Sequence, residues 1–200
     1  MDDWRKVIWS DESKFLIFNH ARSTRVWRKV SEKYKVDCLV PTVKSNANGV
    51  MVWGCFRGGE VGPLAMVDGT IDSDGYIKIL EENLIQWLPD FLDEDDAYFQ
   101  DDNAPIHRSH KVRSWKERNG LLSLPWPAQS PDLNPIEHLW DELERRVRKR
   151  PHSMSNVQCL KEALIEEWKM IPSSVCEKLV ISLVDRVKAV LQSKGNPTEY

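Results

Sequence analysis

The sequence has few cysteines and no long apolar run. Its cysteines, Cys38, Cys55, Cys159 and Cys176, are widely spaced and form no C-x-x-C pair. This spacing predicts neither a zinc cluster nor a disulfide framework, and it fits a reducing compartment. No apolar stretch approaches the roughly 20 residues of a membrane span, and the first residues lack the apolar core of a signal peptide. We therefore expect a soluble, intracellular protein with no membrane partner.

An excess of positive charge is also absent. The chain has 28 Lys and Arg against 31 Asp and Glu, a formal net charge of −3. This total argues against an obviously basic nucleic-acid-binding module. The distribution is uneven, however: residues 81–102 hold nine acidic side chains and no Lys or Arg, whereas 108–118 and 145–150 hold five basic ones each. Separate patches of this kind bind cations in one place and a polyanion in another, although solvated helix faces give the same pattern.

The spacing of apolar residues predicts the fold class. Alternating or β-branched runs predict strands at 6–9, 14–18, 24–29, 49–56, 63–69, 97–102 and 121–124, with a polar turn at 10–13. Helical spacing predicts a helix from Ser73 to Pro89 capped by Asp72, a basic helix at 107–118, and terminal helices at 135–150, 157–170 and 173–192. This order predicts an α/β domain around one mixed sheet. The length suits one buried core, so we expect a single domain over residues 1–200.

Three acidic residues, Asp11, Asp102 and Glu137, lie where predicted strands end or a helix begins. Reactive sites of open α/β sheets gather at such positions, so we expect the three to converge. Converging carboxylates repel one another unless a cation binds them, and hard oxygen ligands suit Mg²⁺ or Mn²⁺. Two such ions about 4 Å apart would activate a water or hydroxyl and stabilise the leaving oxygen of a phosphoryl transfer.

Each of these residues also has a purely structural interpretation. Asp11 is typical of a polar turn, and Asp102, like Asp101, of a helix cap. Glu137 follows Asn134 and a proline, a combination that favours the first turn of a helix. The spacing of the three carboxylates alone does not distinguish catalysis from capping.

Four motifs add a resemblance to a known family. "WSDESKF", "QDDNAPIH", "WPAQSPDLNPIEHLW" and "EEWKMIPSSVCEKLV" resemble the catalytic domain of the Tc-one/mariner superfamily of DNA transposases, and the resemblance covers close to the whole chain. It implies a ribonuclease-H-like fold, with a mixed five-stranded sheet flanked by helices and a helical C-terminal region. It also implies metal-dependent cleavage of DNA at transposon ends, followed by joining of the 3′-hydroxyl to target DNA at a TA dinucleotide.

The resemblance assigns the family's Asp, Asp, Glu triad to Asp11, Asp102 and Glu137, with 34 residues between the last two, the separation that marks the Tc-one branch. It implies that the two aspartates share Mg²⁺ or Mn²⁺, two ions in all, while Glu137 holds the second ion and positions water or the 3′-hydroxyl.

The same motifs suggest supporting residues around the triad. Asn103 and His107 match the family's "DNA-x-x-H" motif, which suggests support behind the metal ligands for Asn103 and a phosphate or metal-shell contact for His107. For His107, a hydrogen bond near the helix cap is the alternative. Asn134, between two prolines, is expected to fix the turn that presents Glu137.

A basic run at the end of the predicted helix 135–150 is a candidate DNA contact. It consists of Arg145, Arg146, Arg148, Lys149 and Arg150. A solvated helix end is the structural alternative, and a nuclear-entry signal is a further one. The resemblance implies transposon-end and target DNA as partners, assembly as a homodimer or larger complex with DNA, and a nuclear location.

The sequence departs from the family pattern in two respects. Asp101 stands where the family usually has Gln, which places an extra negative charge beside Asp102. Complete family members also carry amino-terminal helix-turn-helix modules, which we expect to be absent from residues 1–200; a fragment, a truncated gene model and a remnant of a decayed element are the alternatives. Two other functions therefore compete with transposition. One is an inactive or domesticated remnant that binds DNA, and the other is a nuclease that acts on RNA–DNA hybrids.

Overall fold

Five strands form one mixed sheet at the centre of the molecule. The computed structural model describes residues 2–17, 49–88, 97–127, 130–151 and 155–193. The strands are β1 (Val7–Leu16), β2 (Gly49–Arg57), β3 (Glu60–Val67), β4 (Ala97–Gln100) and β5 (Leu121–Ser123), in the order β3-β2-β1-β4-β5. The β1–β2 and β2–β3 pairs are antiparallel, whereas β4 pairs with β1 and β5 in parallel.

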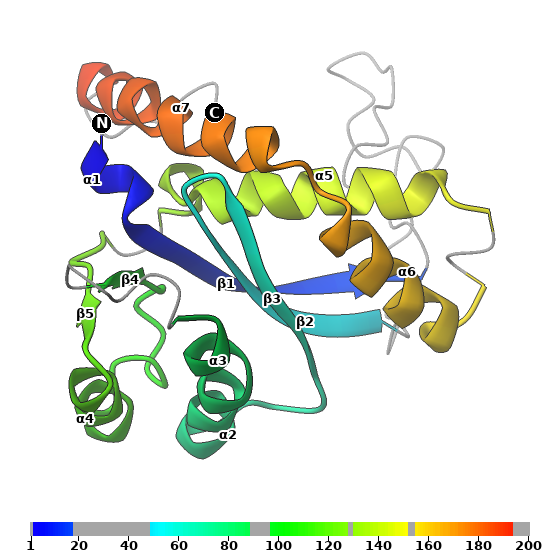
Figure 1. Cartoon of the computed structure of the whole chain (residues 1–200), viewed down its shortest axis with the longest axis horizontal. Helices are drawn as coiled ribbons and strands as arrows, with labels where there is room; N and C mark the ends of the chain where they lie inside the picture. The colour runs from blue at the N-terminus through cyan, green and yellow to red at the C-terminus, as the bar shows by residue number, and fades with distance from the viewer. Residues whose placement is uncertain (1, 18–48, 89–96, 128–129, 152–154, 194–200) are drawn as a thin grey trace, which may run out of the picture.

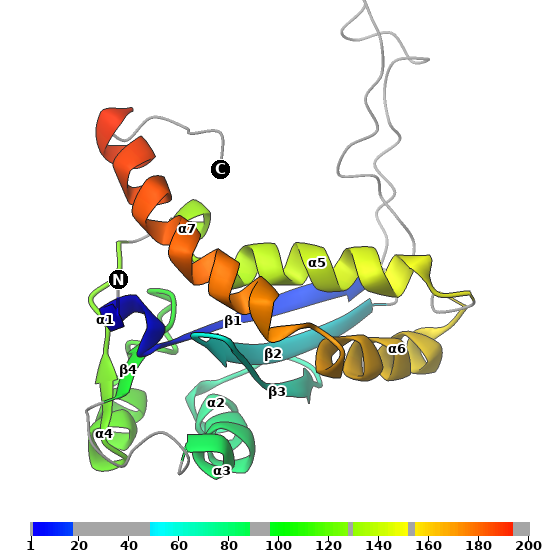
Figure 2. The ribbon, with the colours of Figure 1, turned by 45° about the horizontal axis from the view of Figure 1, so that its top comes forward.

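Helices cover both faces of the sheet (Figures 1 and 2). One face carries the C-terminal helices α5 (Pro135–Lys149), α6 (Val157–Lys169) and α7 (Ser173–Gln192). The other face carries α2 (Ser73–Ile79), the π-helical turn η3 (Leu80–Leu84), α3 (Ile85–Trp87) and α4 (His110–Arg118). The short α1 (Asp2–Arg5) precedes β1, and a 3-10 turn, η5 (Pro131–Leu133), precedes α5. Within the described ranges, no helix is long and apolar enough to cross a membrane.

The side chains of β1 alternate between two hydrophobic cores, one on each face of the sheet. Val7, Trp9 and Phe15 belong to the cluster that includes residues of α5, α6 and α7, whereas Ile8 belongs to the cluster that includes α2 and α4. Successive side chains of a strand point to opposite faces, so odd-numbered positions of β1 face α5. Asp11 therefore projects toward α5, and Glu12 projects toward α2 and α4.

Helix α5 begins where its sequence favours a helix start. Asn134 is the N-cap, its side chain accepts a hydrogen bond from the backbone N–H of Ile136, and Pro135 occupies the first helical position. One stripe of the helix is buried against the sheet: Ile136, Leu139, Trp140, Leu143 and Val147. Each such side chain contributes about 1.5–3 kcal/mol on burial, so the stripe fixes the orientation of α5 and of Glu137 in its first turn.

The predicted turn at 10–13 is wrong. Residues 7–16 form one continuous strand, and Ser10 to Ser13 pair in register with residues 55 to 52 of β2. Three of the four residues, Ser10, Asp11 and Glu12, meet polar groups of other segments. Ser10, for example, is buried and donates a hydrogen bond to the backbone carbonyl of Gln100 at 2.7 Å. A polar run can therefore lie inside a strand when tertiary structure supplies the partners.

Most other boundaries agree with the sequence to within a few residues. The helices at 135–150, 157–170 and 173–192 are confirmed, as is the Asp72 cap, which accepts a hydrogen bond from Gly75 N at 2.8 Å. The basic helix is shorter than predicted, since α4 begins at His110 with Ser109 as its N-cap. The predicted strand at 24–29 and the stop at Pro89 lie outside the described residues.

Candidate active site

Two parallel strands separate at the point where the first two candidate carboxylates lie. The β1–β4 ladder ends with the pair Trp9↔Gln100. Asp11 and Asp102 each lie two residues beyond that pair, Asp11 within β1 and Asp102 in the segment that follows β4. A crevice next to the ends of parallel strands is where α/β sheets commonly place their sites. The prediction that Asp11 lies at the end of a strand is therefore wrong. Asp11 lies within β1, at the level where β4 has ended.

The three candidate carboxylates converge on one pocket. Asp11, Asp102 and Glu137, which come from β1, the segment after β4 and the first turn of α5, all line a pocket of about 370 Å³. Asn103 and Asn134 line it as well, as does Gln100. The predicted basic residues and His107 are not part of this lining. The topology thus brings together five of the predicted residues from three separate segments.

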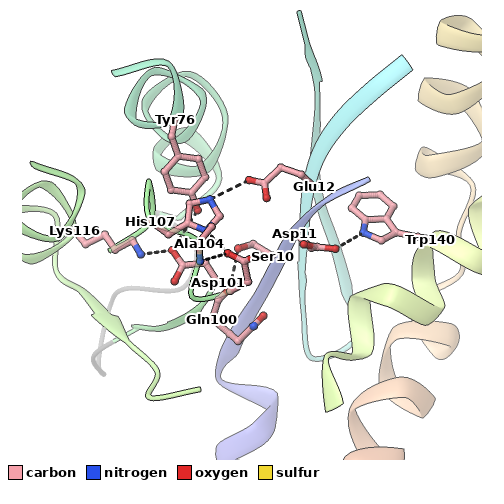
Figure 3. Close-up of polar contacts among 11 residues, drawn as sticks. Ser10, Asp11, Glu12, Tyr76, Gln100, Asp101, Ala104, His107, Lys116 and Trp140 are labelled. Atoms are coloured by element: carbon pink, nitrogen blue, oxygen red, sulfur yellow. Dashed lines mark hydrogen bonds and ion pairs between the residues drawn. The ribbon is translucent and has the colours of Figure 1, made fainter. Parts of the chain in front are cut away.

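Asp11 lies in a largely buried, negatively charged environment. Its Oδ2 accepts a hydrogen bond from the indole Nε1–H of Trp140 at 3.2 Å (Figure 3). Burial, followed by the negative charges of Glu137 and Glu12, raises the pKa of Asp11 from 3.8 to about 7. Asp11 and Glu137 both line the pocket, where like charges repel.

Asp102 has the opposite electrostatic environment. Its Oδ1 accepts a hydrogen bond from the backbone N–H of Ala104 at 2.8 Å and lies 2.6 Å from Nδ1 of His107. The hydrogen bond to His107 lowers the pKa of Asp102. Among the described residues nothing is hydrogen bonded to Oδ2 of Asp102, so this oxygen remains available for a ligand. Asp102 caps no helix, because the cap of α4 is Ser109.

His107 connects Asp102 to a further carboxylate on β1. The imidazole is buried, and its Nε2 lies 3.4 Å from Oε1 of Glu12. Burial alone would lower the pKa of His107, but the hydrogen bond to Asp102 and the interactions with Glu12 raise it to about 10. His107 is therefore a cation held between two carboxylates, with the ring of Tyr76 at 4.2 Å between centroids (Figure 3). Its hydrogen bond holds Oδ1 of Asp102 in place, and His107 is not the cap of α4, which is Ser109.

The extra charge of Asp101 is compensated locally. Asp101 pairs with the buried ammonium of Lys116 and accepts a hydrogen bond from the hydroxyl of Tyr76 at 3.3 Å. Burial raises the pKa of Asp101, and the Lys116 charge opposes this rise. The Asp101 carboxylate thus reaches Lys116 of α4 and Tyr76 of α2 (Figure 3), and Asp101 is not among the residues that line the pocket.

Hydrogen bonds hold Glu137 and the two predicted asparagines in place. The backbone N–H of Glu137 donates to the carbonyl of Asn134 at 3.2 Å, within the first turn of α5. A carboxylate there interacts favourably with the helix dipole. Asn103 donates from its side chain to the carbonyl of Trp126 at 2.8 Å, which ties the segment after β4 to the loop before α5.

The protein side chains do not complete a metal site on their own. Within the described ranges, no three His, Cys, Asp or Glu side chains are gathered tightly enough to hold an ion. Mg²⁺ sites commonly use one or two carboxylates and complete the shell with water and phosphate. The pocket has the donors for such a site, and the substrate would have to supply the rest.

The basic run at the end of α5 is engaged in ion pairs. Arg145 and Arg146 pair with Glu142, Arg148 pairs with Glu144, and Arg150 pairs with Glu166. At 1.5 Å per residue, the run lies roughly 12–20 Å along α5 from Glu137. The structure thus supports the interpretation as a solvated helix end and leaves contact with DNA as a prediction.

Sequence reasoning missed three residues around the pocket. The sequence patterns give no role to Trp140, Gln100 or Glu12. Gln100 is fully buried, and neither atom of its side-chain amide has a hydrogen-bond partner in the described part of the chain. The alternation of a continuous β1 would have revealed Glu12, because it places residues 11 and 12 on opposite faces.

Comparison with known proteins identifies the class to which this fold and site belong. Residues 6–160 match the family model of the DDE superfamily endonucleases, and the chain belongs to that family. It is a transposase catalytic domain. The chain is 42% identical over 198 residues to the Tc1 transposase of Caenorhabditis elegans, a match that covers 99% of this chain and 71% of that protein. The Tcb1 transposase of Caenorhabditis briggsae matches at the same identity and coverage.

Solved structures show the same fold. The Mos1 transposase catalytic domain, solved with raltegravir and Mg, superposes with a TM-score of 0.74 at 19% identity and covers 98% of this chain and 87% of that one. The Mos1 strand transfer complex gives a TM-score of 0.76 at 20% identity and covers 100% of this chain and 57% of that one. The expected ribonuclease-H-like fold, a mixed five-stranded sheet flanked by helices, is thereby confirmed.

Proposed function

We propose that this domain cleaves DNA at transposon ends and joins the freed 3′-hydroxyl to target DNA, with Asp11, Asp102 and Glu137 as the catalytic residues. The observation that carries the proposal is the convergence of these three carboxylates on one pocket. The relatives support it through their names: the Tc1 protein is a transposase, and Mos1 structures are described as paired-end and strand transfer complexes.

The oxygen donors of this pocket suit Mg²⁺ or Mn²⁺, with water and phosphate completing the shell. Asp11 is held at a raised pKa of about 7 by burial and by the charge of Glu137, so the unliganded pocket opposes full ionisation. A divalent cation would remove that opposition, and an all-oxygen donor set favours a hard ion. Mos1 catalytic-domain structures are described with Mg and with Mn. When bound, two such ions would activate the attacking water or hydroxyl and stabilise the leaving oxygen.

The chain's own residues hold the ligands in place. His107 and the N–H of Ala104 fix Oδ1 of Asp102, a residue that lines the pocket, and leave Oδ2 for a ligand. Asn134 starts the helix turn that presents Glu137. Side chains held in this way lose little entropy when substrate binds, which is the physical basis of preorganisation.

The substrate is DNA in this proposal, and the basic run at the end of α5 contributes phosphate contacts. Arg145, Arg146, Arg148 and Arg150 would exchange their glutamate partners for phosphates, a change favoured by counterion release, and Lys149 would add a further contact. Assembly as a dimer or larger complex on DNA, and action in the nucleus, follow from the same proposal. The non-catalytic alternative is not favoured, because all three carboxylates are present and meet in one pocket.

Substitution of Asp102 tests the catalytic assignment. We expect Asp102→Asn to reduce Mg²⁺- or Mn²⁺-dependent nicking of supercoiled plasmid by at least a hundredfold, since it removes a charged ligand but keeps the shape of the side chain. Conversion of supercoiled to relaxed circles on a gel measures the rate. Asp141→Asn makes the same chemical change at an exposed position of α5 and should leave the rate unchanged. Equal nicking by Asp102→Asn and the parent would refute the assignment.

A further inference from the structure

A glycine opposite Asp11 creates a slot in the sheet. Gly54 on β2 is the register partner of Asp11 on β1. A Cβ added at position 54 would lie 2.7 Å from Cη2 of Trp140 and 3.4 Å from Cη2 of Trp168. No side chain fits at position 54 unless the Trp140 ring moves. The absence of a side chain on Gly54 thus lets the indole of α5 approach the sheet next to Asp11.

The indole in this slot is held by further aromatic contacts. Trp140 stacks on Trp168 with 5.1 Å between centroids, and Phe15 meets it edge-on at 6.1 Å. Trp168 is itself fixed, because its Nε1–H donates to the carbonyl of Gly62 on β3 at 2.8 Å. Aromatic pairs in these geometries stabilise the packing beyond area burial alone. The orientation of the Trp140 ring is therefore determined by the core and not by Asp11.

The polar edge of this fixed ring points at the carboxylate. Nε1–H of Trp140 donates to Oδ2 of Asp11 at 3.2 Å. Figure 3 shows the indole reaching from α5 to the side chain on β1. An indole N–H can only donate, so in this contact the Asp11 oxygen is the acceptor. A phenylalanine would fill most of the same space but could not make this contact.

We infer that Trp140, seated in the slot opposite Gly54, is a positioning residue that holds Asp11 in the orientation needed to bind a divalent metal. The inference rests on the proposed function, in which Asp11 is a metal ligand. Residues that orient a metal ligand typically affect metal affinity 10–100-fold when they are removed. The packing role of Trp140 and its orienting role are separable, because they use different parts of the ring.

The test compares two tryptophans that share the stack. In Trp140→Phe we expect the Mn²⁺ concentration for half-maximal plasmid nicking to rise roughly tenfold, with a maximal rate close to that of the parent at saturating Mn²⁺. Trp168→Phe removes an N–H that bonds to Gly62 and not to Asp11, so it should lower thermal stability without changing the Mn²⁺ requirement. Gly54→Ala should shift the Mn²⁺ requirement in the same direction as Trp140→Phe, because it displaces the ring.

A spectroscopic readout is independent of turnover. In ¹⁵N-labelled parent protein, the indole N–H resonance of Trp140 should shift during a Mg²⁺ titration, whereas that of Trp168 should not. The Trp140 signal is identified by its absence in Trp140→Phe or, should that variant fail to fold, by sequential assignment of the parent. An unchanged Mn²⁺ requirement in Trp140→Phe, or an equal change in Trp168→Phe, would overturn the inference alone. Absence of metal-dependent nicking by the parent would overturn the proposed function as well.

Discussion

At the scale of single residues, the site combines two aspartates with opposite electrostatic environments. His107 stabilises the charge on Asp102, whereas burial and Glu137 destabilise the charge on Asp11. Groups whose pKa values are pushed apart in this way commonly mark sites of chemistry. The third aspartate, Asp101, is neutralised by Lys116 and does not contribute to the pocket. Adjacent acidic residues in the sequence therefore differ in function because their side chains reach different partners.

The pKa of Asp11 predicts how stability depends on pH without divalent ions. Because this pKa rises from 3.8 to about 7 on folding, the folded state binds more protons than the unfolded state between these values. The contribution to stability is complete below pH 3.8 and is lost as the pH rises to about 7. We expect Asp11→Asn, which stays neutral, to be more stable than the parent at pH 8 in EDTA. The upper bound is roughly 4 kcal/mol, at about 1.4 kcal/mol per pKa unit.

Urea denaturation at pH 5, 6, 7 and 8 measures this effect. The advantage of Asp11→Asn should shrink steadily toward pH 5, since the parent carboxyl becomes protonated there. The substituted amide oxygen still accepts the Trp140 N–H, so loss of that hydrogen bond does not confound the comparison. A parent whose free energy of unfolding is flat between pH 5 and pH 8 would contradict the assigned pKa.

At the scale of elements, the start of α5 supplies the third carboxylate. A 3-10 turn (η5), Asn134 and Pro135 together define where the helix begins, and Glu137 follows in the first turn. This placement depends on the cap and on the apolar stripe that seats the helix. A shift of α5 by one residue would turn Glu137 away by about 100°, given 3.6 residues per turn. The boundary of this helix is thus part of the site.

Substitution of the cap tests this dependence. Asn134→Ala should cost about 1 kcal/mol of stability and reduce nicking disproportionately, because it loosens the turn that holds Glu137. Asn156→Ala is the matched control: Asn156 caps α6 through a 2.9 Å bond from Cys159 N and does not line the pocket. Urea unfolding and plasmid nicking are measured for both variants. Equal losses of activity in the two would show that the cap affects overall stability only.

At the scale of the whole molecule, the sheet and its two helical layers position the ligands before any ion binds. The two cores hold β1 between α5 on one face and α2 with α4 on the other. Asp11 and Glu12 face opposite layers and meet Trp140 and His107 respectively. An ion that binds this pocket therefore binds the folded state and not the unfolded chain.

We expect Mg²⁺ or Mn²⁺ to raise the melting temperature accordingly. At a concentration one hundred times the dissociation constant, the added stability is about 2.7 kcal/mol, which corresponds to roughly 5–10 °C for a domain of this size. Differential scanning fluorimetry measures the shift, with NaCl at equal ionic strength as the control for screening. The combined variant Asp11→Asn, Asp102→Asn, Glu137→Gln should show no shift beyond that control. A full shift in this variant would place the ion elsewhere.

Local patterns in the sequence predicted much of this molecule. The three C-terminal helices, the α5 cap and the α/β class followed from 3.6-residue spacing and capping residues, which act over a few neighbours. The motifs around Asp11, Asp102 and Glu137 indicated the family, which the comparisons confirmed. Local rules failed at residues 10–13, where a polar run was interpreted as a turn, because its partners are distant in the sequence.

Only the tertiary structure decided which side chains meet. The pairing of β1 with β4 brings Asp11 level with Asp102, and the pairing of β1 with β2 puts Gly54 beside Asp11. Neither register can be derived from hydrophobic spacing, because residues far apart in sequence choose partners according to the packing of the whole sheet. The Trp140 contact to Asp11 and the His107 link to Glu12 depend on those registers. Sequence therefore determined which residues are present at each element, and the fold determined which of them act together.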